Sequence, residues 1–240
     1  MANTLTVAVC ISNEVTLSDF VQPIEILAGI NAAGAPASGF DALPEPFKVV
    51  FDYLAPTMEP IVSVAGPASA TFNPTKTYAE VKANGEQFDV LWVPAADVLV
   101  DRWVGPHAYG GIDRTPPEEI DFIRRQAPKA KYILSVCSGA LQLALAGVLS
   151  GKRATTNKHF YHVITEELVP MRDIDWQPKA RWVVDGNVWT SSGVSAGSDM
   201  ALAFLEHLAG AKLARQVRNI MEIPEVSSDD DPFAAIHGLA

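Results

Sequence analysis

Short apolar runs rich in β-branched residues alternate along the chain with segments of helical hydrophobic spacing. The first run, residues 4–11, is almost uninterrupted and is typical of a buried parallel strand. Residues 19–33 follow, and they place Phe20, Ile24 and Leu27 along one stripe of a helix. The chain therefore opens with the strand-then-helix unit from which parallel α/β sheets are built.

The same alternation continues to residue 221. Further apolar runs predict strands at 47–54, 60–65, 88–93 and 131–136, and helical spacing predicts helices at 117–127, 139–149, 195–208 and 212–221. Residues 181–191 predict a hairpin, with Asp185-Gly186 supplying the tight turn. Residues 94–117 are irregular, and so long a loop in a compact domain is often functional. The pattern predicts a mostly parallel central sheet with helices on both faces.

Length and composition narrow the organisation. The 240 residues contain no internal repeat, so we expect one α/β domain over 1–222 and a C-terminal extension over 223–240. A net charge of −10 argues against a nucleic-acid partner. The apolar runs are too short for a membrane span, and the N-terminus lacks a secretory signal. With only two cysteines and no disulfide framework, a cytoplasmic location is expected.

Cys137 stands where a predicted strand turns directly into a helix. Residues 132–147 read Y-I-L-S-V-C-S-G-A-L-Q-L-A-L-A-G, with small residues after the cysteine. Such a sharp elbow exposes a nucleophile, and the helix N-terminus behind it stabilises a thiolate. The amide of Ser138 is placed to donate to an oxyanion or to substrate. Spacing alone leaves open that Cys137 is merely a small core residue.

Residues 135–156 resemble the nucleophile elbow and following helix of the ThiJ/PfpI (DJ-one/PfpI) superfamily, which is class I glutamine amidotransferase-like. The pieces D-F-V-Q-P-I-E-I-L, D-V-L-W-V-P and W-T-S-S-G-V-S-A-G-S-D-M-A-L match in the same order. The resemblance is greatest to isocyanide (isonitrile) hydratases and their fungal relatives. It implies a flavodoxin-like three-layer sandwich, a catalytic cysteine and a homodimer.

The resemblance gives Asp19 a role beside the cysteine. Asp19 begins the pattern Asp-x-x-x-Pro-x-Glu, which on sequence alone is equally consistent with a helix N-cap. In the hydratases an aspartate at this place handles protons for the sulfur. A carboxyl group that shares a pocket with a thiolate is expected to be pushed toward its protonated form. Ser138 matches a hydroxyl residue that follows the cysteine; it is either a sulfur or substrate contact or a small turn residue.

The chain departs from the superfamily pattern at two places. Ala95 and Ala96 replace two glycines beside the substrate, where we still expect them to bind it together with Ser138 and Gly139. Asn157 replaces a histidine that many members have, which puts a Cys–His pair in doubt. His159 is a weaker candidate for that role, and His107 is a candidate for the roof of the pocket. No metal site and no cofactor are expected.

Three functions remain from this reading. The first is cofactor-free hydration of an isocyanide to an N-substituted formamide, by attack of Cys137, proton transfer from Asp19 and hydrolysis of a thioimidate, which would make the protein a lyase acting on a small molecule. The second is glyoxalase or deglycase chemistry on methylglyoxal, which usually requires a histidine. The third is non-catalytic redox sensing through oxidation of Cys137.

Overall fold

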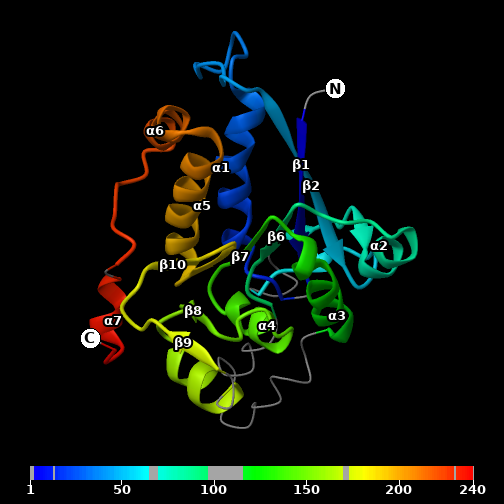
Figure 1. Ribbon diagram of the computed structural model, residues 1–240, viewed down its shortest axis with the longest axis vertical. Helices are drawn as coiled ribbons and strands as arrows, with labels where there is room; N and C mark the ends of the chain where they lie inside the picture. Colours follow the sequence, from blue (N-terminus) through cyan, green and yellow to red (C-terminus); the bar gives the residue numbers. More distant parts are fainter. Residues whose placement is uncertain are drawn as a thin grey trace.

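A seven-stranded sheet forms the centre of the protein (Figure 1). The computed structural model describes residues 3–12, 14–64, 70–96, 116–169, 173–229 and 231–239. In spatial order the strands are β10 (Trp182–Asp185), β11 (Val188–Ser191), β7 (Tyr132–Ser135), β6 (Val90–Val93), β1 (Asn3–Cys10), β2 (Phe47–Ala55) and β5 (Lys76–Thr77). All neighbours in this sheet run parallel except β10, which pairs antiparallel with β11. The predicted hairpin is thus confirmed, and it forms one edge of the sheet.

Helices cover both faces of the sheet, as predicted. One face carries α1 (Val21–Ala32), α5 (Val194–Ala209) and α6 (Ala211–Ile220), and the other carries α2 (Tyr78–Asn84), α3 (Pro117–Gln126) and α4 (Gly139–Leu145) (Figure 1). Each layer of helices encloses its own cluster of buried apolar side chains against the sheet. The three-layer α/β sandwich is therefore confirmed.

Smaller elements surround this frame. They are the strand pairs β3 (Ile61–Val62) with β4 (Thr71–Phe72) and β8 (Lys152–Ala154) with β9 (Ile174–Trp176), the 3₁₀ turns η1 (Leu17–Asp19) and η4 (Ala127–Lys129), the π-helix η5 (Val163–Leu168) and the short helix α7 (Pro232–Ile236). The described residues include no helix long and apolar enough to cross a membrane.

The sequence patterns did not predict the helical elements α2, η5 and α7, and they overestimated the length of α4. Helix α2 begins with a capping box, in which Thr77 accepts from the amide of Glu80 and the Glu80 side chain accepts from the amide of Thr77. This T-x-x-E signature was present in the sequence. Helix α4 ends at Leu145 rather than at 149, because the chain turns before Gly147, whose φ is +82°. Most of the irregular segment predicted at 94–117, including His107, lies outside the described residues.

Gly139 lets the elbow after β7 approach the end of β6. A Cβ atom at this position would overlap the carbonyl oxygen of Val93 and lie 3.0 Å from that of Pro94. Both are backbone atoms of a central strand and its exit, so they cannot rotate away. Glycine is therefore required here for packing, and it fixes how deeply the elbow sits in the sheet.

We expect Gly139→Ala to lower the free energy of unfolding by about 3 kcal/mol or more, because the added methyl group must displace backbone. Gly39→Ala is the matched control: Gly39 has a φ of +72° and open space around it, so its substitution carries only the left-handed backbone cost of about 1 kcal/mol. Urea unfolding of both variants measures the difference. Equal losses would show that no steric contact constrains Gly139.

Candidate active site

Cys137 occupies a strained backbone position immediately after the strand β7. Its φ is +61°, in the left-handed region that non-glycine residues rarely adopt. Two hydrogen bonds hold this conformation: the Cys137 amide donates to the carbonyl of Ser192 at 2.8 Å, and its carbonyl accepts from Oγ1 of Thr156 at 2.9 Å. The predicted elbow is present, and it is fixed by segments that follow β8 and β11.

The sulfur of Cys137 is enclosed and accepts hydrogen bonds. Nδ2 of Asn157 donates to Sγ at 3.1 Å, and the residue is only 6% exposed. Burial raises the pKa of the thiol well above its ordinary value, and the charge of Asp19 raises it further, while hydrogen bonds from Asn157 and Ser138 lower it. Desolvation outweighs these hydrogen bonds, so burial opposes the thiolate that the helix N-terminus was expected to stabilise.

Asp19 ends the 3₁₀ turn η1 and is fully buried. Its Oδ2 accepts from the amide of Ala95 at 3.0 Å, and its backbone carbonyl accepts from Nε1 of Trp92 at 3.0 Å. The N-cap of α1 is Phe20, without a side-chain cap. The alternative that Asp19 caps this helix is therefore wrong; its carboxyl group instead faces the exit of β6.

Burial raises the pKa of Asp19 from 3.8 to about 7, against the lowering effect of the Ala95 amide. The direction of this pKa shift agrees with the expectation, but its cause is burial and not a neighbouring thiolate. The second oxygen, Oδ1, is buried and has no hydrogen-bond partner within the described residues. Near neutral pH, Asp19 is thus able both to accept and to donate a proton through Oδ1, which makes no hydrogen bond to any described residue.

Cys137 and Asp19 are electrostatically coupled, since the charge of Asp19 raises the pKa of the thiol. Two anions in one desolvated site repel each other, so the pair favours holding at least one proton. Moving that proton from sulfur to carboxyl leaves the thiolate beside a neutral acid and avoids the double charge. The arrangement can therefore produce a nucleophile and the acid that protonates its product in a single step.

The backbone residues predicted to bind substrate divide into two groups. Ser138 and Gly139 lie at the elbow, directly after Cys137, and both are buried. Ala95 and Ala96 are buried where the chain leaves β6, but the amide of Ala95 is committed to Asp19. Ala95 therefore orients the carboxyl group and does not offer its N–H to a substrate, contrary to the prediction.

Asn157 and His159 have different environments. Asn157 reaches the sulfur, and its Oδ1 accepts from the backbone amide of His159 at 2.9 Å. The His159 ring packs instead against Phe160 and His237, with centroids 4.7 and 5.2 Å apart. The contact that a histidine would make with the sulfur is thus made by an amide, which does not titrate. Among the described residues, no group of three or more His, Cys, Asp or Glu side chains could hold a metal ion.

A buried polar cluster contacts the backbone directly after β6. Nε2 of Gln142 donates to the carbonyl of Pro94 at 3.0 Å and to Glu119 at 3.3 Å. Glu119 is fully buried and also accepts from the hydroxyls of Ser12 and Tyr78. Burial raises the pKa of Glu119. Sequence reasoning missed this cluster, because an acidic residue near a helix N-terminus ordinarily indicates an exposed first turn.

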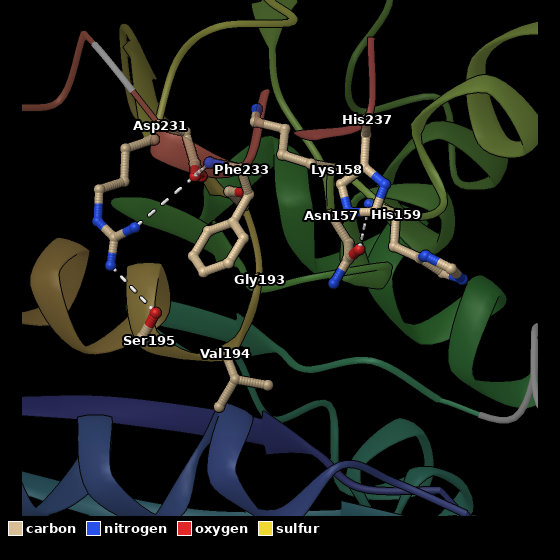
Figure 2. Close-up of a pocket in the computed structure, with 11 residues that line it drawn as sticks. Asn157, Lys158, His159, Gly193, Val194, Ser195, Asp231, Phe233 and His237 are labelled. Atoms are coloured by element: carbon tan, nitrogen blue, oxygen red, sulfur yellow. Dashed lines mark hydrogen bonds and ion pairs between the residues drawn. The ribbon is translucent and has the colours of Figure 1, made fainter. Parts of the chain in front are cut away.

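A pocket of about 360 Å³ opens beside Asn157 (Figure 2). Its walls come from the segment after β8, from the start of α5 and from the C-terminal residues around α7. Ser192 and Gly193, which follow β11, also line it. The pocket therefore borders the residues that hold and contact Cys137.

Several residues that hold the site were not singled out from sequence, although they lie in segments that carried the family resemblance. Thr156 ends the R-A-T-T stretch, Ser192 and Gly193 belong to W-T-S-S-G, and Trp92 belongs to D-V-L-W-V-P. Their place inside these matching segments was the signal by which sequence analysis was able to find them. Lys158 and Asp231 carried no such signal, since their burial depends on how the C-terminal segment packs.

Comparison with known proteins supports the likeness in sequence and in fold. Residues 5–207 match the DJ-1/PfpI family. Isonitrile hydratase from Pseudomonas putida is 34% identical over 163 residues, which are 68% of this chain and 62% of that protein. The match thus covers less than two thirds of the relative's own length.

Two solved structures share the fold. A ThiJ/PfpI family protein from Pseudomonas syringae aligns over 97% of this chain and 78% of its own, with a TM-score of 0.69 and 24% identity. DJ-1beta from Drosophila melanogaster aligns over 94% of this chain and 100% of its own, with a TM-score of 0.66 and 19% identity. At these identities, the likeness establishes the architecture.

The raised pKa of Asp19 predicts a pH-dependent cost in stability. The folded protein binds this proton more tightly than the unfolded chain, so the favourable contribution is complete below about pH 4 and is lost as the pH rises to about 7. Relative to Asp19→Asn, wild type is expected to lose about 4 kcal/mol across this range. Chemical unfolding of both proteins between pH 4 and 8 measures the difference.

Glu25→Gln removes the same charge from the exposed face of α1 and is the matched control. A wild-type-minus-variant difference in unfolding free energy that falls equally with rising pH for Glu25→Gln and Asp19→Asn would show that Asp19 is not the buried acid responsible.

The Asn157 contact predicts the ionisation of the thiol. Asn157→Asp replaces the donor on Sγ by a carboxylate of the same shape, so the apparent pKa of Cys137 should rise and thiolate should fall by about tenfold or more at a given pH. The pH profile of iodoacetamide alkylation reports this, since Cys10 is fully buried. Asn219→Asp, exposed on α6, adds the same charge as a control. An unchanged profile in Asn157→Asp would contradict the contact.

Proposed function

Because this chain belongs to the DJ-1/PfpI family, we propose that it is a lyase that hydrates an isocyanide to an N-substituted formamide. Cys137 is the nucleophile and Asp19 the proton carrier. The observation that carries the proposal is the buried Cys137 thiol, held in a left-handed elbow and electrostatically coupled to the buried Asp19, whose Oδ1 has no hydrogen-bond partner among the described residues. The likeness to an isonitrile hydratase supports the choice of substrate class.

The first step forms a thioimidate. The thiol proton passes to ionised Asp19 as Sγ attacks the terminal carbon of R–N≡C, and Asp19 returns that proton to the same carbon. The product is R–N=CH–S–Cys137, with Asp19 ionised again. No net proton is consumed, which suits a site that stabilises one shared proton better than two charges.

The second step adds water. Ionised Asp19 takes one proton from water as the water oxygen attacks the thioimidate carbon, and Asp19 then passes that proton to the nitrogen, which gives R–NH–CH(OH)–S–Cys137. The remaining hydroxyl proton is the one that the sulfur regains in the next step. The C–S bond then breaks, the carbonyl of R–NH–CHO forms, and the thiol regains its proton. The sum is R–N≡C plus H₂O giving R–NH–CHO. Carbon needs no external oxidant, reductant or cofactor in this sequence.

Asn157 and Ser138 have supporting roles in this scheme. Both lower the pKa of the Cys137 thiol through hydrogen bonds, so they stabilise the sulfur as negative charge develops during attack and again as the C–S bond breaks. Glyoxalase chemistry is less well supported, because the nearest histidine in sequence, His159, packs against Phe160 and His237.

The setting of the enzyme is also a proposal. We propose a cytoplasmic homodimer that acts on a small molecule, because superfamily members commonly form dimers. Sedimentation equilibrium checks the dimer: the 25.8 kDa chain would sediment at about twice its own mass, and a single species at the chain mass would contradict this proposal.

The direct test measures formamide production from p-nitrophenyl isocyanide. Cys137→Ala should abolish turnover because it removes the nucleophile. Asp19→Asn should reduce kcat by at least about 100-fold because the shared proton has no carrier. Glu25→Gln and Cys10→Ala are matched controls that should retain activity.

The same proteins are assayed with methylglyoxal. A folded, reduced wild-type protein that forms no formamide but forms lactate would replace the hydratase proposal with glyoxalase chemistry. Absence of both products, together with ready oxidation of Cys137 by peroxide, would favour a redox sensor instead.

A further inference from the structure

The pocket beside Asn157 is built by parts of the chain that are far apart in sequence. Figure 2 shows Asn157 on one side, Val194 and Ser195 on another, and the C-terminal residues Phe233 and His237 closing it. Its volume, about 360 Å³, lies within the range of small-molecule sites. It shares the lining residue Asn157 with the surroundings of Cys137.

Contacts connect this pocket to the reactive sulfur. Nδ2 of Asn157 lies 3.1 Å from Sγ of Cys137, while Asn157 itself lines the pocket. A Cβ placed on Gly193 would lie 3.3 Å from the same Nδ2 atom, so Gly193 leaves room beside the amide. Ser192, whose carbonyl holds the Cys137 amide, lines the pocket as well. The pocket is therefore separated from the sulfur by Asn157 and Ser192, which contact Cys137, and Cys137 itself does not line it.

The charged side chains around the pocket already have hydrogen-bond or ion-pair partners within the protein. Arg181 forms two contacts with Asp199, at 2.8 and 2.6 Å, donates to Ser195 and lies 3.9 Å from Asp231. Nζ of Lys158 is buried and donates to Oγ1 of Thr155 and to a backbone carbonyl. The formal charges of Arg181, Lys158, Asp199 and Asp231 sum to zero. A charged ligand would gain no uncompensated partner here.

The pocket instead presents apolar side chains to solvent. Phe233 is 49% exposed and Val194 is 38% exposed, and both line it. Figure 2 shows the Phe233 ring reaching from the C-terminal segment into the space above Val194. A ligand that covers these two side chains removes apolar surface from water, which favours a neutral, apolar group.

The wall that carries Phe233 is held in place by hydrogen bonds. The amide of Asp231 donates to the carbonyl of Lys179 at 2.7 Å, and the Asp231 side chain accepts from the amide of Phe233 at 3.0 Å. The amide of Arg181 donates to the carbonyl of Ser228 at 2.8 Å. Ser228, Asp231 and Phe233 lie beyond residue 207, where the family match ends, and their partners Lys179 and Arg181 lie within it. The wall is therefore supplied by a segment outside the matched region.

We infer that the C-terminal segment 227–239 sets substrate selectivity. Phe233 of this segment and Val194 of α5 form the binding site for the N-substituent of the isocyanide, and this site favours a neutral aromatic or other apolar group. This inference rests on the proposed hydratase function for the identity of the reacting group. Its ligand chemistry comes from the apolar walls and the compensated charges.

Selectivity is tested with two substrates, p-nitrophenyl isocyanide and methyl isocyanide. Phe233→Ala should raise KM for the aryl substrate by about tenfold, because an apolar contact is lost, and should leave the methyl substrate nearly unchanged. Val194→Ala should act in the same direction. Ile236→Ala is the matched control, since Ile236 lies on the same helix α7, is 70% exposed and does not line the pocket.

A binding measurement separates this inference from the reaction. The Kd of p-nitroformanilide is measured by calorimetry in Cys137→Ala and in two double variants, which add Phe233→Ala or Ile236→Ala. N-methylformamide serves as the small probe in the same three proteins. Phe233-dependent binding of the aryl probe by a protein that hydrates no isocyanide would reject the hydratase function and support the pocket. Turnover of the aryl substrate with an unchanged aryl-to-methyl ratio in Phe233→Ala and Val194→Ala would overturn the inference and leave the function standing.

Discussion

The central constraint of this protein is the burial of two ionisable groups, the thiol of Cys137 and the carboxyl of Asp19, in one desolvated place. Burial is the largest influence on the pKa of each, and the charge of one disfavours the charge of the other. Neither group ionises easily unless the other keeps a proton. The surrounding structure arranges this pair: β7 and its elbow deliver the sulfur, and the exit of β6 holds the carboxyl through the amide of Ala95.

The frame around this pair is rigid because backbone atoms make most of its contacts. Cys137 is held in a left-handed conformation by Ser192 and Thr156, and Gly139 is pressed against the Val93 carbonyl. Below them, Gln142 joins the Pro94 carbonyl to Glu119. Strain at a single residue persists only where neighbours over-determine it. Here the segments that follow β8 and β11 and the end of β6 together fix the elbow, which keeps the sulfur in place.

The sequence allowed the sheet, most helices and the elbow to be predicted, because each leaves a local pattern, whereas the role of Asp19 was expected only from the family resemblance. The capping box of α2 shows that even a missed helix had such a signal. No local sequence pattern indicated the raised pKa of Cys137, since that pKa depends on how completely packing excludes water from the sulfur. The role of Ala95 was also misjudged, because its amide donates to Asp19. This contact depends on how the end of β6 packs against the turn before α1, which the sequence does not reveal. Local patterns thus identify the reactive groups, whereas burial determines their ionisation.

Asn157 changes how such a site responds to pH. A histidine in contact with the sulfur would be able to become a cation and stabilise the thiolate by charge, and it would add its own titration near neutral pH. The amide of Asn157 donates a hydrogen bond without changing charge. Control over the proton therefore lies with Asp19, whose pKa of about 7 places the exchange between carboxyl and thiol within the neutral range. In the proposed reaction, a single acid thus provides the proton for carbon and accepts a proton from the water that follows.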